Sequence, residues 1–292
     1  MVKCVLILFK VIIVYIEMEI IMLINQKIID PFYVILKNRE MIVEMSTKEI
    51  RDKYKGQPLG LFWALFHPLV LIGVYIFLYG VVFQTRVEIA EQNTMTFTAY
   101  LLSGMIPWLC IQSALTGGSV SVLSNSAFIK QVVFPVEVFP IKAVGSALII
   151  EFIYLIIDIV YCIVTSKSIL WTYILLPYII VVQVIFLIGV NYFISAITVY
   201  LRDLKDIVQV FCMVGVYIMP VIYLPAAVPE MFQVIMYINP LSHYIWIFQD
   251  VLFYGSIEHW YSWTICTAIS LVVLYLGHYV YKKLKIGFGS AL

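Results

Sequence analysis

Six long apolar segments constrain this chain more than any other feature of its sequence. They cover residues 59–83, 97–122, 141–165, 171–200, 207–224 and 260–281. A helix needs about 20 mostly apolar residues to cross the hydrocarbon core of a bilayer. These segments also lack the period-two alternation of transmembrane β-strands. We therefore expect an all-α integral membrane protein with six transmembrane helices.

The composition argues against the main classes of soluble protein. Of the 292 residues, 63% are hydrophobic and only 12% are charged, whereas soluble domains carry about 25% charged residues. Such a chain cannot cover itself with a solvated surface, which excludes a cytosolic enzyme, a nucleic-acid-binding protein and a disordered protein. The five cysteines are scattered singly through the sequence, so we expect neither a disulfide framework nor a metal site.

The basic residues predict the topology. If the N-terminus is cytoplasmic, 16 Lys and Arg residues lie on the inner side of the membrane and only two, Arg86 and Lys167, on the outer side. Cytoplasmic loops of membrane proteins carry the excess of basic residues. We therefore expect both termini, including the tail 286–292, to face the cytoplasm.

Two segments precede the first predicted span. Residues 1–30 are strongly apolar but lack the cleavage site of a signal peptide, and Lys10, Glu17 and Glu19 make a transmembrane helix costly. We expect this extension to lie in the membrane interface or not to be translated, with a seventh span as the alternative. Residues 31–58 carry a basic face and predict an amphipathic interface helix, with a solvated lead-in as the alternative.

Two segments between spans predict short helices. In the loop 122–131, Ser124 or Asn125 is suited to cap a short helix, which would serve as a docking point for a soluble partner or as a plain connector. The outer segment 225–259 has no basic residue and is strongly apolar, but three prolines divide it into pieces too short to span. We expect these pieces to be re-entrant helices on the outer side.

Aromatic residues and two acids are the candidate functional side chains within the membrane. The aromatic residues crowd the outer half of the chain, where an interfacial belt is the usual explanation. The alternative is a path of rings along which sugar faces stack and slide. Candidates for this path are Trp108, Tyr217, Tyr223, Tyr244, Trp246, Phe253 and Trp260. Glu151 and Asp158 lie seven residues apart in the third span, and acids within a membrane are functional candidates, for example in ion coupling.

Several short motifs of the chain occur in the order and at the spacing of a known family. The stretch KEIRDKYKGQPLGLFWALFHP (48–68) resembles the opening of ABC-2 type transporter permeases of the polysaccharide and polyol-phosphate export group. The resemblance covers about residues 33–285. It rests on Tyr54, Leu59, Gly60, Trp63 and Pro68, then Gly104, Pro107 and Trp108, Asn125 with Phe134-Pro135, Arg202-Asp203-Leu204, Asn239-Pro240 and the closing YKKL.

The resemblance implies a half-transporter. Two copies would pair around one channel above a separate pair of ABC ATPase subunits. By position, the coupling helix would cover about 122–131 and the outer gate helices about 230–238 and 241–254. Candidate ATPase-coupling residues are Lys48, Arg51, Lys53, Tyr54, Asn125, Phe128, Lys130, Arg202 and Asp203. Lys53 and Gln249 depart from the pattern, since the family usually has Arg at both positions.

ATP hydrolysis is expected on another polypeptide. The chain has no G-x-x-x-x-G-K-[ST] loop and no Gly-Lys pair, so ATP and Mg²⁺ would bind to the partner ATPase and no cofactor to this chain. We expect the permease subunit, in the bacterial cytoplasmic (inner) membrane, of an exporter for a lipid-linked polysaccharide or polyol phosphate. The alternatives are an ABC-2 permease for a small lipid or drug, an ion-coupled flippase and a membrane-embedded enzyme.

Overall fold

The computed structural model describes residues 31–60, 62–82, 97–131, 134–166, 168–225 and 228–292, so the extension 1–30 lies outside it. All regular elements of this part are helical, as the sequence predicts. Within these described ranges, four helices are long and apolar enough to cross a membrane. They cover Phe97–Val120, Val138–Thr165, Trp171–Tyr200 and Trp260–Lys285.

These spans correspond to the helices α4 (Phe97–Val120), α6 (Val138–Ser166), α7 (Leu176–Tyr200, preceded by η3, Trp171–Leu175) and α11 (Trp260–Lys285). Shorter elements complete the described chain. They are α2 (Arg39–Lys53), α3 (Phe62–Tyr75), η1 (Ile76–Val82), η2 (Leu123–Asn125), α5 (Ser126–Gln131), α8 (Leu204–Ile218), α9 (Glu230–Ile238), α10 (Pro240–Gln249), η5 (Asp250–Tyr254) and α12 (Phe288–Ala291).

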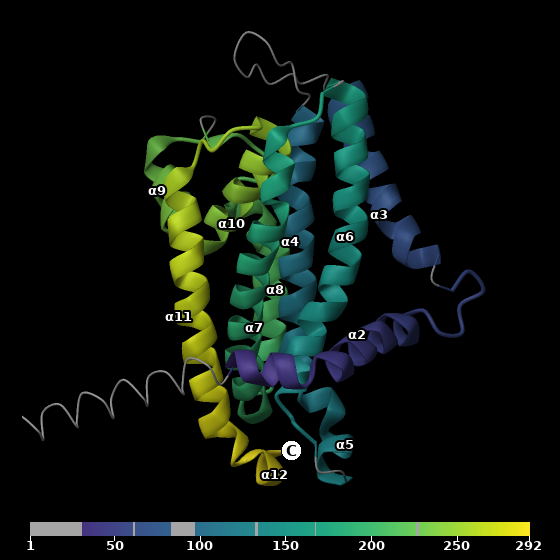
Figure 1. Ribbon diagram of the computed structural model, residues 1–292, viewed down its shortest axis with the longest axis vertical. Coiled ribbons are helices and arrows are strands. Elements are labelled where there is room, and N and C mark those ends of the chain that lie inside the picture. The colour runs from purple at the N-terminus through teal and green to yellow at the C-terminus, as the bar shows by residue number, and fades with distance from the viewer. Residues whose placement is uncertain (1–30, 61, 83–96, 132–133, 167, 226–227) are drawn as a thin grey trace, which may run out of the picture.

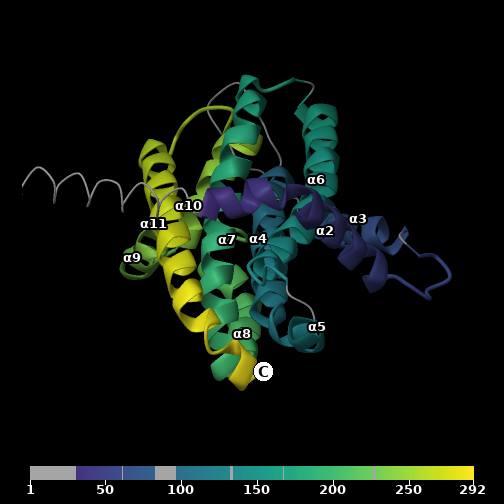
Figure 2. The same cartoon turned by 60° about the horizontal axis from the view of Figure 1, so that its bottom comes forward.

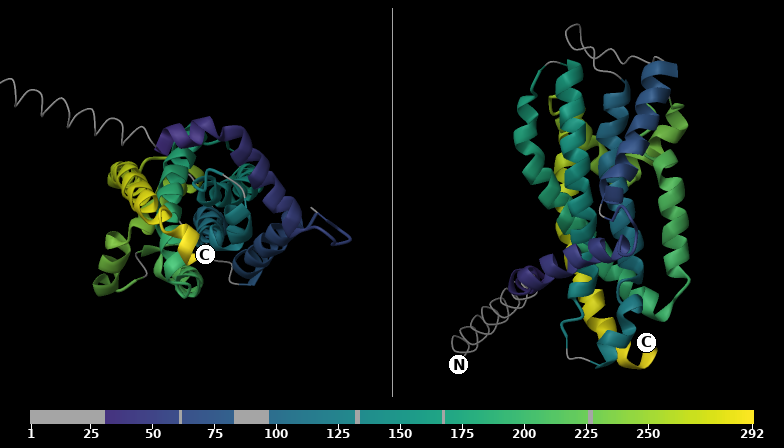
Figure 3. Two further views of the ribbon diagram at one scale, coloured as in Figure 1. Left: turned by 90° about the horizontal axis from the view of Figure 1, so that it is seen from below. Right: turned by 90° about the vertical axis from the view of Figure 1, so that its right-hand side faces the viewer.

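The long helices run side by side with α3 and α8 along them, and most of the other short elements lie at the two ends of the bundle (Figure 1). We call the end that carries α2, α5 and α12 the basal end, and the end that carries α9, α10 and η5 the apical end. Helix α2 crosses the basal part almost at right angles to the bundle (Figure 3). Seen with the basal end turned forward, α2 passes in front of α7 and α4 (Figure 2).

Two predicted spans differ from the structure in their form. The segment 59–83 becomes α3 followed by the π-helical turns of η1. The segment predicted at 207–224 starts earlier, at Leu204, and its helix ends at Ile218. Met219 is already extended, with φ −95° and ψ 159°, because the residue before a proline, here Pro220, is disfavoured in a helical conformation.

Helix α4 forms the centre of the bundle, and 83% of the residues in its most apolar 18-residue stretch are buried. Small residues let its neighbours approach closely, as is usual for helices in membranes. At Gly118 the side chain of Asn191 from α7 fills the space of a side chain, and its Nδ2 donates a 2.9 Å hydrogen bond to the Ala114 carbonyl. On another side, the indole ring of Trp108 packs against Gly215 of α8.

Helices α7 and α11 approach each other most closely at Gly189 and Gly277. A Cβ atom added at Gly277 would collide with the carbonyl oxygen of Gly189, and one added at Gly189 would collide with the backbone of Leu274. The two backbones therefore touch without intervening side chains. Dispersion contacts along such a seam replace the hydrophobic driving force that is missing between helices in lipid.

We predict that Gly277→Ala lowers the melting temperature of the purified protein by on the order of 5 °C, because overpacking a tight contact costs about 1–3 kcal/mol. Thermal unfolding in detergent, followed by size-exclusion chromatography, measures this change. Gly73→Ala is the matched control, since a Cβ atom at this helical glycine meets open space. If Gly277→Ala and the wild type have the same melting temperature, α7 and α11 can move apart at this contact without loss of stability.

Candidate functional site

The basal end gathers the basic residues of the described chain. All 13 of its Lys and Arg residues lie on basal elements or on the basal ends of helices, from Lys37 and Arg39 of the first described segment to Lys285. The predicted coupling residues share this end. Lys48, Arg51, Lys53, Lys130, Arg202 and Asp203 are exposed there, whereas Tyr54 is buried and Asn125 is half-buried.

Helix α2 is fixed to the basal end of α6. Ser46 Oγ donates a 3.1 Å hydrogen bond to the Lys142 carbonyl, and the Lys142 Nζ lies 3.2 Å from Glu49 Oε2. Gly145 permits this crossing, because a Cβ atom there would collide with Ser46. The predicted amphipathic region thus forms a helix that presents Lys48 and Arg51 outward from a fixed position.

Tyr54 closes the end of α2. Its ring packs with Ile50, Trp63 and Ile150 and so joins α2 to α3 and α6. Removal of its hydroxyl from water raises the pKa of Tyr54 above its ordinary value.

Helix α5 projects from the basal end as a short knob (Figure 1). It is anchored by Phe128, whose ring lies 5.2 Å from that of Phe134 and 6.3 Å from that of Phe139, while 43% of the side chain stays exposed. The residues Ser124 and Asn125, predicted as caps, are used differently. The Asn125 amide donates a 2.7 Å hydrogen bond to the Ser121 carbonyl and closes the turn before α5.

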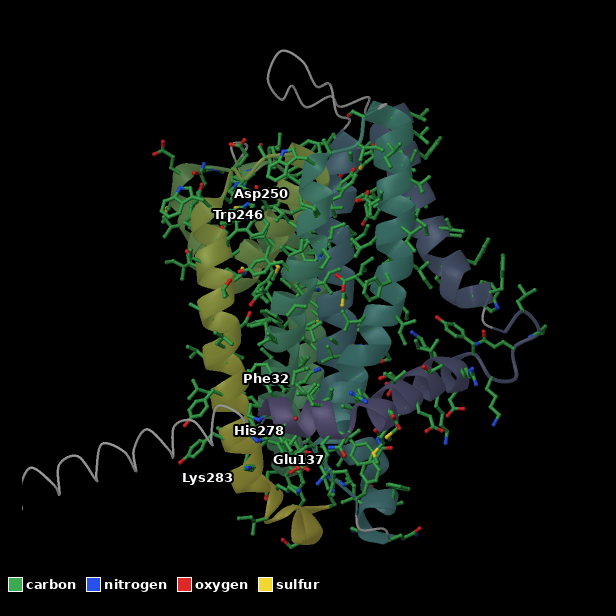
Figure 4. All side chains as sticks on the ribbon, in the orientation of Figure 1. Phe32, Glu137, Trp246, Asp250, His278 and Lys283 are labelled. Carbon is green, nitrogen blue, oxygen red and sulfur yellow. The ribbon has the colours of Figure 1, made fainter. Side chains whose placement is uncertain are left out.

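An ion pair ties the segment after α5 to the end of α11. Lys285 Nζ lies 2.6 Å from Glu137 Oε1, and the Tyr281 hydroxyl donates to the Val136 carbonyl at 2.9 Å. Figure 4 shows Glu137 at the basal end, close to the end of α11. The sequence alone did not predict this ion pair, because 148 residues separate its two charges and no local pattern connects them.

The apical end contains the two helices predicted from the outer segment. Asn239 caps α10 by accepting a 3.0 Å hydrogen bond from Leu241 N. Gly255, with φ +68°, ends η5 in the left-handed conformation that favours glycine. Gln249, where the resembling family usually has Arg, is buried and donates to the Pro220 carbonyl at 2.8 Å, so it holds the loop after α8.

Asp250 connects η5 to the start of α11. Its Oδ1 accepts a hydrogen bond from His259 Nδ1 at 2.7 Å, and its Oδ2 accepts from His259 N at 3.1 Å and from Trp263 Nε1 at 2.9 Å. The His259 ring in turn stacks on Trp246, with 5.2 Å between centroids. We call this set of four residues the apical latch (Figure 4 shows Trp246 and Asp250). Its acid and histidine were visible in the sequence, but their contact depends on the turn at Gly255.

The candidate aromatic path divides into two groups. Trp108, Tyr244, Trp246 and Phe253 are buried in the protein core, so in this conformation they present no surface along which a polymer could slide. Each ring is enclosed by neighbouring helices in this conformation, and a role of these four residues in a polymer path stays a prediction. Tyr217 and Trp260 are exposed and Tyr223 is half-buried, and these three remain candidates.

The two intramembrane acids both point into the protein. Glu151 and Asp158 are 2% and 0% exposed. The Cys162 thiol lies 3.8 Å from Asp158 Oδ1, whereas both carboxyl oxygens of Glu151 are buried without a hydrogen-bond partner in the described part of the chain. The thiol of Cys110 and the amide of Gln183 face Glu151 without forming a good hydrogen bond.

We predict that Asp250→Ala lowers the melting temperature by several degrees, because the donors of His259 and Trp263 lose their acceptor, at a cost of about 1–3 kcal/mol. Hydrogen exchange followed by mass spectrometry should show loss of protection in α10 and η5. Glu258→Ala is the control, since this acid lies in the same loop but is exposed. Unchanged protection in Asp250→Ala would contradict a stabilising role for the apical latch.

Comparison with known proteins agrees with this architecture. The family model described as "ABC-2 type transporter" matches residues 41–253. The chain is also 27% identical over 262 residues to an O-antigen export system permease protein RfbA of Klebsiella pneumoniae, covering 87% of this chain and 95% of the relative. A protein of the same name from Myxococcus xanthus is 22% identical over 256 residues, covering 87% and 96%. The match over most of its length shows that the chain belongs to the ABC-2 type transporter family.

Proposed function

We propose that this chain is the permease subunit of an ATP-driven exporter that moves a lipid-linked polysaccharide or polyol phosphate across the bacterial cytoplasmic membrane. The observation that carries the proposal is the basal end, where a short projecting helix and all the described basic residues form one surface within an ABC-2 family chain. The names of the relatives, which are O-antigen export permeases, support a polysaccharide as cargo.

In this proposal six helices span the membrane. The two shorter ones are α3 with η1, which together cover 62–82, and α8. Both expose apolar side chains along much of their length, as lipid-facing or interface helices do. The basal end, including the C-terminus, faces the cytoplasm because its excess of basic residues obeys the positive-inside rule.

The partner ATPase docks at the basal end. The exposed half of Phe128 offers an apolar contact, and the surrounding basic residues Lys130, Lys48 and Arg51 offer complementary charge. ATP and Mg²⁺ bind to that partner. The Glu137–Lys285 ion pair lies six residues beyond the end of α5 and would link a displacement of this region to α11.

A second copy of the chain completes the channel. Helix α8 presents an apolar face that a membrane protein covers either with lipid or with protein. Its exposed side chains include Ile207, Val210, Phe211, Met213, Val214 and Tyr217. Pairing along this face would place Tyr217 at the interface, and the exposed apolar surface of α9 would flank it.

We predict that Phe128→Ala reduces binding of the partner ATPase by at least about tenfold, because a partly exposed aromatic at the centre of a docking helix is typical of an interface hot spot. Co-purification from cells that express the chain together with its partner ABC ATPase measures this loss. Val164→Ala, an exposed apolar residue at the apical end of α6, is the control. A permease that exports polymer alone, or full binding in Phe128→Ala, would contradict the proposal.

The buried acids of α6 favour the ion-coupled flippase as the second candidate, because Glu151 is buried without an ion pair in the described residues. The two candidates differ in their energy source. Export by the permease should stop when the partner ATPase is inactivated and should survive an uncoupler of the proton gradient for as long as ATP is supplied. The reverse result would establish the flippase.

A further inference from the structure

A polar cleft opens between α3 and the rest of the bundle. Helix α3 leans away from α4 and α6 towards its basal end (Figure 1), and a cavity of about 310 Å³ lies in this region. Its polar lining comes from four helices, with Lys53, His67, Gln112, Ser113, Thr116 and Glu151, and apolar and aromatic side chains complete the wall. A second hollow of about 390 Å³ adjoins it and shares Lys53, Ser113 and Thr116.

Glu151 is the group in this cleft that packing does not explain. Its carboxyl is 2% exposed and lines the cavity, and neither oxygen forms a hydrogen bond of good geometry among the described residues, although the Cys110 thiol and the Gln183 amide lie near it. The amide of Gln183 beside it is likewise unsatisfied. Buried polar groups are normally hydrogen-bonded, and an acid within a membrane is costly. Such a group, aimed into a cavity, calls for a ligand that donates hydrogen bonds.

The mouth of the cleft carries basic side chains, in contrast to the buried acid Glu151 in its interior. Lys53 and His67 are exposed there, and the Lys53 Nζ lies 5.7 Å from the centroid of the Tyr54 ring. The other acid on the cleft, Glu49, is already paired with Lys142 at 3.2 Å. The charge left at the mouth is therefore positive, and an anionic group is favoured there.

Between the mouth of the cleft and Glu151, the walls offer hydrogen-bond acceptors and donors. Thr116 Oγ1 donates to the Gln112 carbonyl at 2.8 Å, so its lone pairs remain to accept from a ligand, and the Gln112 amide and Ser113 hydroxyl lie beside it. Small-molecule pockets have volumes of about 300–1,000 Å³. The cleft thus has room for one sugar or polyol unit with a phosphate, and not for a length of polymer.

We propose that this cleft binds the headgroup of a lipid, with a phosphate against Lys53 and His67 and the hydroxyls of a sugar or polyol against Glu151, Gln112 and Ser113. The hydrocarbon chain would run along the exposed apolar side chains of α3, among them Phe66, Leu69 and Val70. The proposal rests on the proposed function in one respect: the preferred lipid is the one that carries the glycan. The cleft is then a site at which the permease selects its cargo.

The test uses the purified permease without its ATPase. Native mass spectrometry would measure retention of three probes: a polyprenyl diphosphate-linked monosaccharide, phosphatidylglycerol and phosphatidylcholine. We expect the glycolipid to bind at least about tenfold more tightly than phosphatidylcholine, because phosphatidylcholine has no hydroxyl groups that could donate hydrogen bonds to Glu151. If phosphatidylglycerol binds as tightly as the glycolipid, the cleft is a site for ordinary phospholipid and the cargo assignment is wrong.

Two substitutions test the two ends of the cleft. Glu151→Leu should weaken glycolipid binding about tenfold or more without lowering the melting temperature, because an unsatisfied buried acid is replaced by an apolar side chain. Glu151→Gln, of the same shape, covers the case in which leucine disturbs folding and should weaken binding in the same direction. Lys53→Gln should weaken binding of both phosphate-bearing anionic probes and reduce its dependence on salt.

Matched controls separate a binding role from a structural one. Asp158→Asn changes another buried acid of α6 that does not line the cleft, and Lys55→Gln changes an exposed lysine two residues from Lys53; both should bind the glycolipid within about twofold of wild type. Unchanged binding in Glu151→Leu and Glu151→Gln would overturn the inference and leave the export function standing. Intact binding in a chain that supports no export in cells would overturn the export function alone.

Discussion

Close contact between helix backbones is the constraint on which the rest of this structure depends. Lipid provides no hydrophobic drive for one apolar helix to leave it for another, so helices associate where small residues let them touch. Here Gly189 meets Gly277, Gly118 accommodates Asn191, and Gly215 accommodates Trp108. These contacts hold α4, α7, α8 and α11 in one body. The apical elements also find polar partners within the bundle, as the hydrogen bond from Thr172 Oγ1 to the Val251 carbonyl shows.

Charge and apolar surface divide the molecule between its ends and its sides. The basic residues of the described chain lie at the basal end, while the apical end is held by a single buried carboxylate, Asp250. The sides are apolar wherever they face outward, with the cleft between α3 and α6 as a polar interruption. The basal basic residues, the apical helices and the lateral cleft thus occupy three separate places, joined by the helices that run between them.

The sequence predicts the elements of the fold far better than the contacts among them. Apolar length is a local property, and it predicts the four long helices at nearly their observed bounds. The prolines divide the outer segment into short pieces, whereas the bounds expected for α5, α9 and α10 came from the family resemblance. The burial of Trp246 against His259 and the pairing of Glu137 with Lys285 depend on residues distant in the chain. An aromatic residue in the outer half has the same sequence signature whether it faces lipid, a channel or the core, so its role could not be assigned before the structure. Glu151 was noticed as an acid in a membrane, but its cavity required four helices to be placed.

The continuity of α11 has a mechanical consequence. Its 26 residues span about 39 Å at the usual rise of 1.5 Å per residue. Near one terminus the helix is clamped to the segment after α5, and near the other Trp263 grips the acid that ends α10. Hydrogen bonds along its axis make a helix stiff in its long direction. A displacement of the Lys285 end would therefore move the Trp263 end with it. The close backbone contact between Gly277 and Gly189 would limit how far α11 can slide along α7.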